Sequence, residues 1–377
     1  MMFASSLLAA ALAVQAADTG FRVRPGYEVK VLANDLREAR FLEFGQKNVL
    51  YLSQPNTGAI QSFRYINGTL KPLGNFVKDK PTVHGLCWAN GWLWFSQTGS
   101  IWKARDKNDD GIADEVVNVI PEGRLPRGGG HWWRSLLVTN DSIYTSIGDS
   151  GNINDETGTE RQKVYRFNLD GANKRLYASG IRNTEKLRLR PGTTEVWGID
   201  HGSDWFGREA GDRPGQQPIT DTNPPEELNK FVEGGFYGHA FVTGNRVPRY
   251  EYLKRPDIND LAAKTIVPAW TFGAHWAING FCFYTGSLFP ADFKGDIFIA
   301  AHGSWNSSKP VGYQVGRVLF DKWTGMPYGY QSLVLTTDPQ GKVLARPVDC
   351  VQAPDGSVIF SCDATRRIFR LGPARSR

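Results

Sequence analysis

One pattern recurs six times along this 377-residue chain and limits the folds open to it. Each copy consists of an apolar strand, a tight turn, a second apolar strand and a polar loop. The copies begin at Ala39, His84, His131, Arg182, Asn279 and Arg346. A repeat of this kind stacks one unit against the next, because a single unit cannot bury its own apolar face.

The residues within and between the copies favour an all-β fold. Short β-branched or aromatic stretches alternate with Gly, Pro, Asn and Asp turns at intervals of about ten residues, without convincing helical periodicity after the N-terminal leader. Most copies are followed by a third strand, such as "KVYRFNL" or "RIFRLG". Six units of this kind predict a six-bladed β-propeller, with "GYEVKVLA" near the N-terminus closing the ring against the last blade. A β-sandwich is the alternative.

The first sixteen residues, "MMFASSLLAAALAVQA", are apolar and end in the small residues that a signal peptidase accepts. They lack the usual Lys or Arg before the apolar stretch, so a disordered or anchoring tail is the alternative. We predict a signal peptide over residues 1–16, a single domain over 17–377, and a secreted, extracellular glycoprotein. Sequons at Asn67, Asn140 and Asn306 agree with export. No later segment is apolar and long enough to span a bilayer, so no membrane attachment is expected.

Cysteine spacing and charge exclude some functions and leave others open. The four cysteines fit no metal-site spacing. Cys350 and Cys362 flank the turn "APDG" and are expected to form either a disulfide across a hairpin or a pair of buried thiols. The net charge of +6 is spread along the chain without a run of five basic residues. Nucleic-acid binding is therefore not expected.

The phase of the repeat predicts a site at one mouth of the propeller channel. Residues just before the first strand and just after the second strand of each copy meet at that rim. If Val138 and Ile143 flank the turn "TNDS", His131 lies opposite Ser150 and next to Asp149, since opposed Cα atoms in paired strands are about 5 Å apart. The same register in the fourth copy places Asn183 opposite Gly202.

Other copies deliver further polar residues to the same mouth: Arg182, His201, His302, Trp305 and Arg346. Each residue also has a structural interpretation, as a hydrogen-bonded histidine, a surface salt bridge, a turn former or part of the packing at a blade edge. Their concentration at one phase of the repeat favours a functional site.

The stretch "DKNDDGIAD" is a separate signal. Its Asp106, Asn108, Asp110 and Asp114 alternate around Gly111, like the first nine positions of an EF-hand calcium loop. The bidentate Glu of that loop is replaced by Val117. We expect a structural calcium ion here, and a solvated acidic loop is the alternative.

At these residues the chain resembles the soluble quinoprotein sugar dehydrogenases, above all the fungal pyranose dehydrogenases and bacterial sorbosone-dehydrogenase-like proteins. The resemblance extends from "GYEVKVLA" to "RIFRLG". It is carried by "HWWRSLLV", "YTSIGDSGN", "ASGIRN", "PPEELN", "AHGSWNSSKPVGYQV" and "RPVDCVQAPDG". It implies a six-bladed propeller that binds pyrroloquinoline quinone (PQQ) and calcium over the channel mouth.

The resemblance also implies roles for individual residues. His131 matches the catalytic base, Asp149 the acidic residue near it, and Arg182 the arginine at the quinone carbonyl. Asn183 and Arg346 match cofactor contacts, while Gly202 and Ser203 match the backbone carbonyls that hold calcium. The family's cofactor-binding lysine has no clean partner, so Lys309, His302 or Trp305 is expected to replace it. The second of two cofactor-binding arginines falls on Val348.

The chemistry of the mouth residues agrees with this resemblance. Alcohol oxidation needs a base, a hydride acceptor and positive charge near the growing oxyanion. No side chain accepts hydride, and the sequence has no Gly-rich nucleotide fingerprint, so an organic cofactor such as PQQ is required. The expected substrate is a pyranose or 2-keto aldose, oxidised at its anomeric carbon, and the expected electron acceptor is external, such as a secreted redox protein. A calcium-dependent sugar lactonase and a non-enzymatic extracellular binding propeller are the alternatives.

Overall fold

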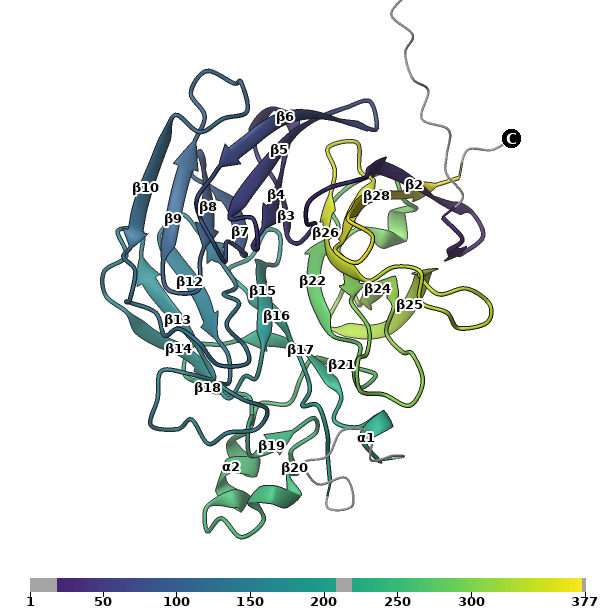
Figure 1. Ribbon diagram of the computed structural model, residues 1–377. Coiled ribbons are helices and arrows are strands. Elements are labelled where there is room, and N and C mark those ends of the chain that lie inside the picture. Colours follow the sequence, from purple (N-terminus) through teal and green to yellow (C-terminus); the bar gives the residue numbers. More distant parts are fainter. Residues whose placement is uncertain (1–18, 208–218, 375–377) are drawn as a thin grey trace, which may run out of the picture.

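The computed structural model describes residues 19–207 and 219–374. In these residues six large sheets are arranged around a central axis, and the chain is nearly all β (Figure 1). The predicted six-bladed β-propeller is confirmed, and the β-sandwich alternative is wrong. The predicted signal peptide lies outside the described residues. No helix in the described part of the chain is apolar and long enough to cross a membrane.

Blades 1 to 3 follow one another along the first half of the chain, each starting with the strand nearest the axis. Blade 1 contains β3 (Leu42–Phe44), β4 (Val49–Gln54), β5 (Ala59–Ile66) and β6 (Thr69–Val77). Blade 2 contains β7 (Leu86–Ala89), β8 (Trp92–Ser96), β9 (Ile101–Arg105) and β10 (Glu115–Ile120). Blade 3 contains β11 (Leu137–Val138), β12 (Ser142–Ile147), β13 (Lys163–Asn168), β14 (Arg175–Ser179) and β18 (Gly235–Phe236).

Blades 4 to 6 complete the ring. Blade 4 contains β15 (Thr184–Leu189), β16 (Val196–Asp200), β17 (Glu226–Phe231) and β21 (Trp270–Phe272). Blade 5 contains β22 (Ile278–Phe283), β23 (Ile297–Ala301), β24 (Gln314–Phe320), β25 (Pro327–Leu335) and β1 (Arg22–Val23). Blade 6 contains β26 (Pro347–Gln352), β27 (Val358–Cys362), β28 (Arg367–Pro373) and β2 (Tyr27–Ala33). The six predicted copies correspond to the six inner strands, in order.

The chain closes the ring as predicted. Strand β2 pairs antiparallel with β28, so residues near the two ends of the described chain share one blade (Figure 1). Strand β1 adds a second contact by pairing with β25 of blade 5. The predicted turn in blade 3 is also confirmed, because Val138 pairs with Ile143.

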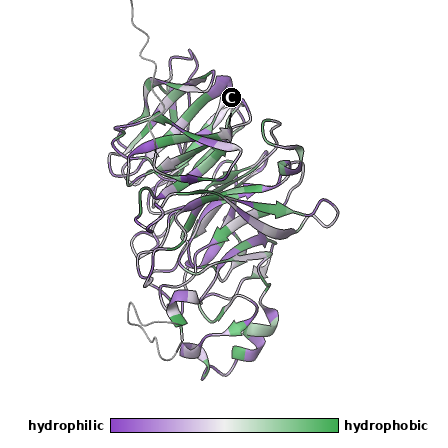
Figure 2. Ribbon diagram, turned by 90° about the vertical axis from the view of Figure 1, so that its right-hand side faces the viewer, coloured by the Kyte–Doolittle hydropathy of each residue, from purple (hydrophilic) through white to green (hydrophobic). Residues whose placement is uncertain are grey.

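An insertion between β17 and β21 departs from the simple repeat. It holds the helix α2 (Ile258–Lys264) and the hairpin of β19 (Val242–Thr243) and β20 (Val247–Pro248), with its own small apolar cluster. The insertion projects from the ring in Figures 1 and 2. Elsewhere in the described residues the helical turns are α1 (Ile219–Thr222) and the 3₁₀ turns at Gln46–Asn48, Tyr250–Tyr252 and Ala291–Phe293.

Large apolar side chains fill the spaces between neighbouring blades, so hydrophobic residues are spread over the whole ring in Figure 2. Trp197 of blade 4, for example, is fully buried and packs with Phe320 of blade 5. Burial of such a side chain stabilises the fold by about 2 to 3 kcal/mol. Close to the axis, ion pairs join inner strands of different blades: Lys186 lies 2.5 Å from Asp349, and Arg188 lies 2.6 Å from Glu43.

Candidate active site

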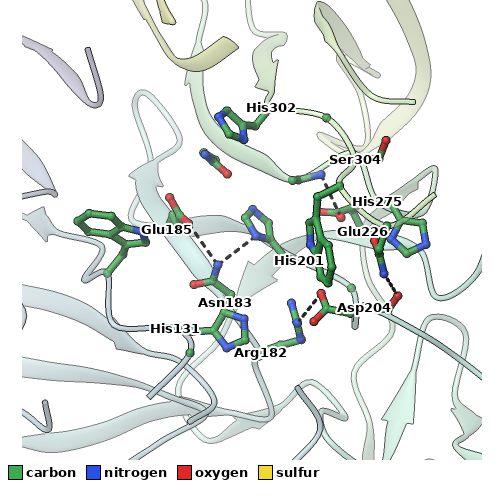
Figure 3. Close-up of a pocket in the computed structure, with 18 of the residues that line it drawn as sticks. His131, Arg182, Asn183, Glu185, His201, Asp204, Glu226, His275, His302 and Ser304 are labelled. Carbon is green, nitrogen blue, oxygen red and sulfur yellow. Dashed lines mark hydrogen bonds and ion pairs between the residues drawn. The ribbon is translucent and has the colours of Figure 1, made fainter. Parts of the chain in front are cut away.

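A cavity of about 460 Å³ opens at the end of the axis where the inner strands begin (Figure 3). Its walls come from blades 1, 3, 4 and 5. The predicted mouth residues among its lining residues are His131, Arg182, Asn183, His201, Gly202, His302 and Trp305. Four other residues with a predicted role at the mouth do not line it: Asp149, Ser203, Lys309 and Arg346.

His131 has the geometry of a proton acceptor. Its Nδ1 lies 3.0 Å from the backbone carbonyl oxygen of Asp149. A carbonyl oxygen only accepts hydrogen bonds, so Nδ1 carries the hydrogen and the lone pair is on Nε2. Burial and the nearby Arg182 cation lower the pKa of His131 well below its usual value. The ring is therefore neutral at neutral pH.

Asp149 lies beside His131 as predicted by the hairpin register, but its carboxylate does not line the cavity. The carboxylate is fully buried, where it accepts hydrogen bonds from the Gly151 amide and the Gln162 side chain and lies 2.7 Å from Nε2 of His239. Burial alone would raise the pKa of Asp149, but His239 and these donors lower it to about 2. Asp149 thus orients His131 through its backbone carbonyl, and its carboxylate ties the loop after β12 to the insertion.

Arg182 provides fixed positive charge at the cavity wall. Its Nη2 lies 3.1 Å from the Asp204 carboxylate and 2.8 Å from Oδ1 of Asn152, and its Nε donates to the Asn152 carbonyl over 3.0 Å. The backbone amides of Arg182 and Asn183 both donate to the buried Asp200 carboxylate over 2.8 Å. These contacts fix the guanidinium plane before any ligand binds.

Asn183 lies opposite His201, one residue before the predicted Gly202. The His201 amide donates to the Asn183 carbonyl over 3.3 Å. The shift arises from a bulge in the pairing of β15 with β16, between the Thr184 and Leu187 pairs. The Asn183 amide group lies 3.2 Å from Oε1 of Glu185 and 3.0 Å from Nδ1 of His201 (Figure 3).

Arg40 and Glu185 line the cavity although neither was predicted. Their side chains are 3.2 Å apart, and burial raises the pKa of Glu185 although Arg40 opposes that shift. Nε of Arg40 is buried without a hydrogen-bond partner in the described residues. Arg40 stands one residue after the start of the first copy, so the phase argument that singled out Arg182 could have found it.

Glu226 is a second unpredicted residue of the cavity. Oε1 accepts a hydrogen bond from the Ala277 amide over 3.1 Å, while Oε2 is buried without a partner among the described residues. Burial raises the pKa of Glu226 to about 8, so the carboxyl group is mostly protonated at neutral pH. Glu226 begins the third strand of blade 4, whereas the residues predicted to meet at the mouth come from before the first strand and after the second strand of each copy. Its sequence signal was the motif "PPEELN".

His302 and Trp305 lie on the blade 5 side of the cavity. Nε2 of His302 lies 3.0 Å from the Asp363 carboxylate, so the ring is held in place from blade 6. The side chain of Trp305 is 64% exposed. An indole this exposed in a cavity wall is available to a ligand.

Two residues predicted to contact the cofactor, Arg346 and Lys309, lie outside the lining of the cavity. Arg346 does not line the cavity; its guanidinium donates to the carbonyls of His302 and Gly303 over 3.1 and 3.0 Å and supports that segment from outside. Lys309 is exposed and also absent from the lining. Of the three residues proposed to replace the family's lysine, only His302 and Trp305 are positioned to do so.

The calcium predictions remain predictions. Gly202 lines the cavity. The Ser203 side chain is buried, and its hydroxyl oxygen accepts a hydrogen bond from Nη1 of Arg249 over 2.7 Å. In the loop at 106–114, the carboxylates of Asp106, Asp110 and Asp114 accept hydrogen bonds from the loop's own backbone amides. Within the described ranges, no group of three or more His, Cys, Asp and Glu side chains is arranged to hold a metal ion.

The cysteines are buried thiols, so the disulfide alternative is wrong. In the blade 6 hairpin Cys362 pairs with Pro347, whereas Cys350 pairs with Phe360. The two sulfur atoms are therefore not opposite each other, although both residues flank the same turn.

Comparisons with known proteins agree on the fold. A family model described as TrAA12-like matches residues 21–240 and 253–374. A calcium structure of a Trichoderma reesei carbohydrate-active enzyme of family AA12 is 18% identical, with a TM-score of 0.80 over 96% of this chain and 99% of that one. The holo PQQ domain of a Coprinopsis cinerea pyranose dehydrogenase is 17% identical, with a TM-score of 0.79 over 93% and 97%. The apo-form of the soluble aldose sugar dehydrogenase from Escherichia coli is 17% identical, with a TM-score of 0.62 over 92% and 100%.

Proposed function

The chain belongs to the TrAA12-like family of PQQ-dependent sugar oxidoreductases, and from this we propose that it oxidises the anomeric carbon of a pyranose or a 2-keto aldose. The lone pair on Nε2 of His131 carries the proposal. Sugar oxidation begins with loss of the anomeric hydroxyl proton, and a neutral imidazole with a fixed tautomer is suited to accept it.

The residues of the cavity fit PQQ, a flat polycarboxylate. Nε of Arg40 and the guanidinium of Arg182 offer positive charge and donors to carboxylates or a quinone carbonyl. Trp305 presents flat apolar surface in the same walls. We propose that Arg40, Arg182, Asn183 and Trp305 hold the cofactor, with His302 beside them. When bound, PQQ supplies the two-electron acceptor that side chains lack.

Each polar residue then has a definable task. His131 accepts the hydroxyl proton at Nε2, and the Asp149 carbonyl keeps the ring in the tautomer that can do so. The charge of Arg182 favours electron density moving toward the acceptor side of the cavity. The same charge helps to keep His131 neutral, which preserves the base at neutral pH.

Calcium belongs to the proposal as a second component. The Gly202 and Ser203 carbonyls are proposed to bind an ion next to the cofactor, which is supported by the place of Gly202 in the cavity wall. The Asp106 loop is proposed to bind a structural ion through Asp106, Asn108, Asp110 and Asp114. Hard oxygen ligands of this kind suit calcium.

We further propose that the enzyme is secreted and passes its electrons to an external acceptor, such as a secreted redox protein, without nucleic-acid or membrane partners. The leader, the sequons and the dispersed charge support this view. Asn67 and Asn140 are exposed, as glycan acceptors must be, whereas Asn306 is buried and lines the cavity.

Reconstitution tests the proposal. Purified apoprotein is titrated with PQQ, with and without calcium, while absorbance reports binding and an artificial dye reports turnover with aldoses and 2-keto aldoses. We expect dye reduction only when PQQ and a reducing sugar are both present. Tight PQQ binding without turnover on any such sugar would overturn the proposed substrate class.

A further inference from the structure

Two tryptophans stand in series between the cavity and the outer surface. Trp133 lines the cavity. Trp132 lines a separate groove of about 590 Å³ on the same side of the ring. The centroids of the two rings are only 3.7 Å apart, with an angle of 31° between their planes. The indole pair is thus the wall between cavity and groove.

Contacts of Trp133, the indole that lines the cavity, hold the pair in place. Trp133 stacks on His84 with 4.2 Å between ring centroids, and the Arg40 guanidinium lies 5.3 Å from the Trp133 ring. His84 is 1% exposed, so this stack cannot swing into solvent. The next residue, Arg134, is fully buried and donates to the carbonyls of Thr98 and Trp133 over 3.0 and 3.1 Å, which fixes the backbone of the pair.

The groove itself suits an apolar planar ligand. Its lining residues are Pro81, Thr82, Gln97, Thr98, Arg127, Gly128 and Trp132. Its only charged lining side chain, Arg127, is ion-paired with Glu122. The amide of Gln97 is occupied by the Pro81 carbonyl over 2.6 Å. The wall offers few free polar groups to a sugar, and the Thr98 hydroxyl among them is buried without a partner in the described residues, whereas an aromatic ring needs only a flat apolar face.

We propose that this groove is the binding site for a planar quinone that serves as the electron acceptor, and that electrons leave the cavity through the stacked rings of Trp133 and Trp132. The inference rests on the proposed function, because it requires a reduced cofactor in the cavity. Stacked π systems couple electronically better than the same distance of saturated chain. The indole pair therefore improves the electronic coupling between the cofactor in the cavity and the quinone in the groove.

The exchange balances without further reactants. The bound quinone takes up two electrons through the indole pair and two protons from solvent, and leaves as the hydroquinone. The reduced cofactor gives up the same two electrons and releases two protons, which returns it to its oxidised form. Each sugar oxidised therefore consumes one quinone.

The test separates quinone binding from catalysis. Calorimetric titration of the cofactor-free protein with 2,6-dimethoxy-1,4-benzoquinone measures quinone binding without turnover, and the difference between wild type and Trp132→Leu isolates the contribution of the groove. We expect Trp132→Leu to weaken binding at least tenfold and Trp132→Phe to restore most of it. Trp323→Leu is the matched control, since Trp323 is 95% exposed and remote from the sites described. Equal quinone affinity in wild type and Trp132→Leu would overturn the proposal. A variant that binds the quinone normally but loses affinity for a maltooligosaccharide would also overturn it.

Stopped-flow measurements on the PQQ-loaded protein complete the test. We expect Trp132→Leu to slow reoxidation by the quinone at least tenfold, while reduction by sugar stays within about threefold of wild type. If sugar failed to reduce the cofactor in the wild-type protein, the proposed function would be refuted. The titration of the cofactor-free protein would still show whether the groove binds the quinone. Unchanged reoxidation in Trp132→Leu would refute the electron route.

Discussion

The cavity and the loop at residues 106–114 are both rich in polar side chains, but their hydrogen bonding differs. In the cavity, Nε of Arg40 and Oε2 of Glu226 are buried without partners in the described structure. In the loop, the carboxylate of Asp106 by itself accepts three hydrogen bonds, from the backbone amides of Asn108, Asp109 and Gly111. Unmet polar capacity of buried groups indicates a place for a ligand, whereas the loop has already satisfied much of its own capacity.

The largest effect is expected at the base of the cavity. His131→Ala should lower dye-linked sugar oxidation by about 100-fold or more, the usual contribution of a general base, while PQQ binding persists. Steady-state kinetics and cofactor absorbance measure the two quantities. Near-normal turnover at neutral pH would remove His131 from the reaction.

The pH profile sharpens the same assignment. A group with a depressed pKa stays deprotonated to lower pH, so kcat/KM should remain flat as the pH falls through the ordinary histidine range near 6.5. A base with the ordinary pKa near 6.5 would lose about fivefold between pH 6.5 and 5.5, because its deprotonated fraction falls from one half to about one eleventh. Such a loss, in protein shown to remain folded, would contradict the neutral-His131 argument.

Glu226 offers a stability test of the cavity. Its folded pKa of about 8 exceeds the unfolded value, so unfolding releases a proton at neutral pH and stability falls as the pH rises toward 8. In Glu226→Gln this loss should shrink by up to about 1.4 kcal/mol per pH unit. Denaturant unfolding of the apoprotein at pH 5.5, 6.5 and 7.5 measures it. Identical slopes in the two proteins would show that Glu226 is ionised in the folded state.

In the loop, the expected effect is on stability alone. Asp106→Ala removes three hydrogen bonds to backbone amides and should cost about 1 to 2 kcal/mol of unfolding free energy, with kcat unchanged. Calcium added to the apoprotein provides the contrast. If it stabilises the wild type but not this variant, the loop is the proposed ion site; loss of turnover in the variant would break the distinction between the two regions.

The smallest effect is expected at Lys309. Because its side chain is exposed and outside the cavity lining, Lys309→Ala should change PQQ affinity by no more than about twofold. Fluorescence titration with PQQ measures the affinity of Lys309→Ala. The Arg182→Met variant, which should bind PQQ far more weakly, is titrated in parallel to show how large the loss is when a cavity residue is changed. A comparable loss in both variants would return Lys309 to the cofactor site.

The reach of sequence reasoning follows the range of the interactions. A hairpin register is local, so the turn between Val138 and Ile143 and the position of His131 beside Asp149 could be predicted. The direction of the Asp149 carboxylate could not, because its partner His239 comes from an insertion ninety residues further along the chain. Bulges at the starts of β15 and β26 likewise shift pairing in ways that turn spacing does not reveal.

The closure of the ring by β2 and β28 has a consequence for how the molecule could be redesigned. Since strands from the two ends of the described chain pair in blade 6, the ring is closed there by a non-covalent seam, and circular permutation could move that seam to another outer loop. The present seam leaves blades 3 and 4, which carry His131 and Arg182, as one uninterrupted stretch of chain. During synthesis those two blades can assemble as neighbours before β26, β27 and β28 are made and pair with β2 to complete blade 6.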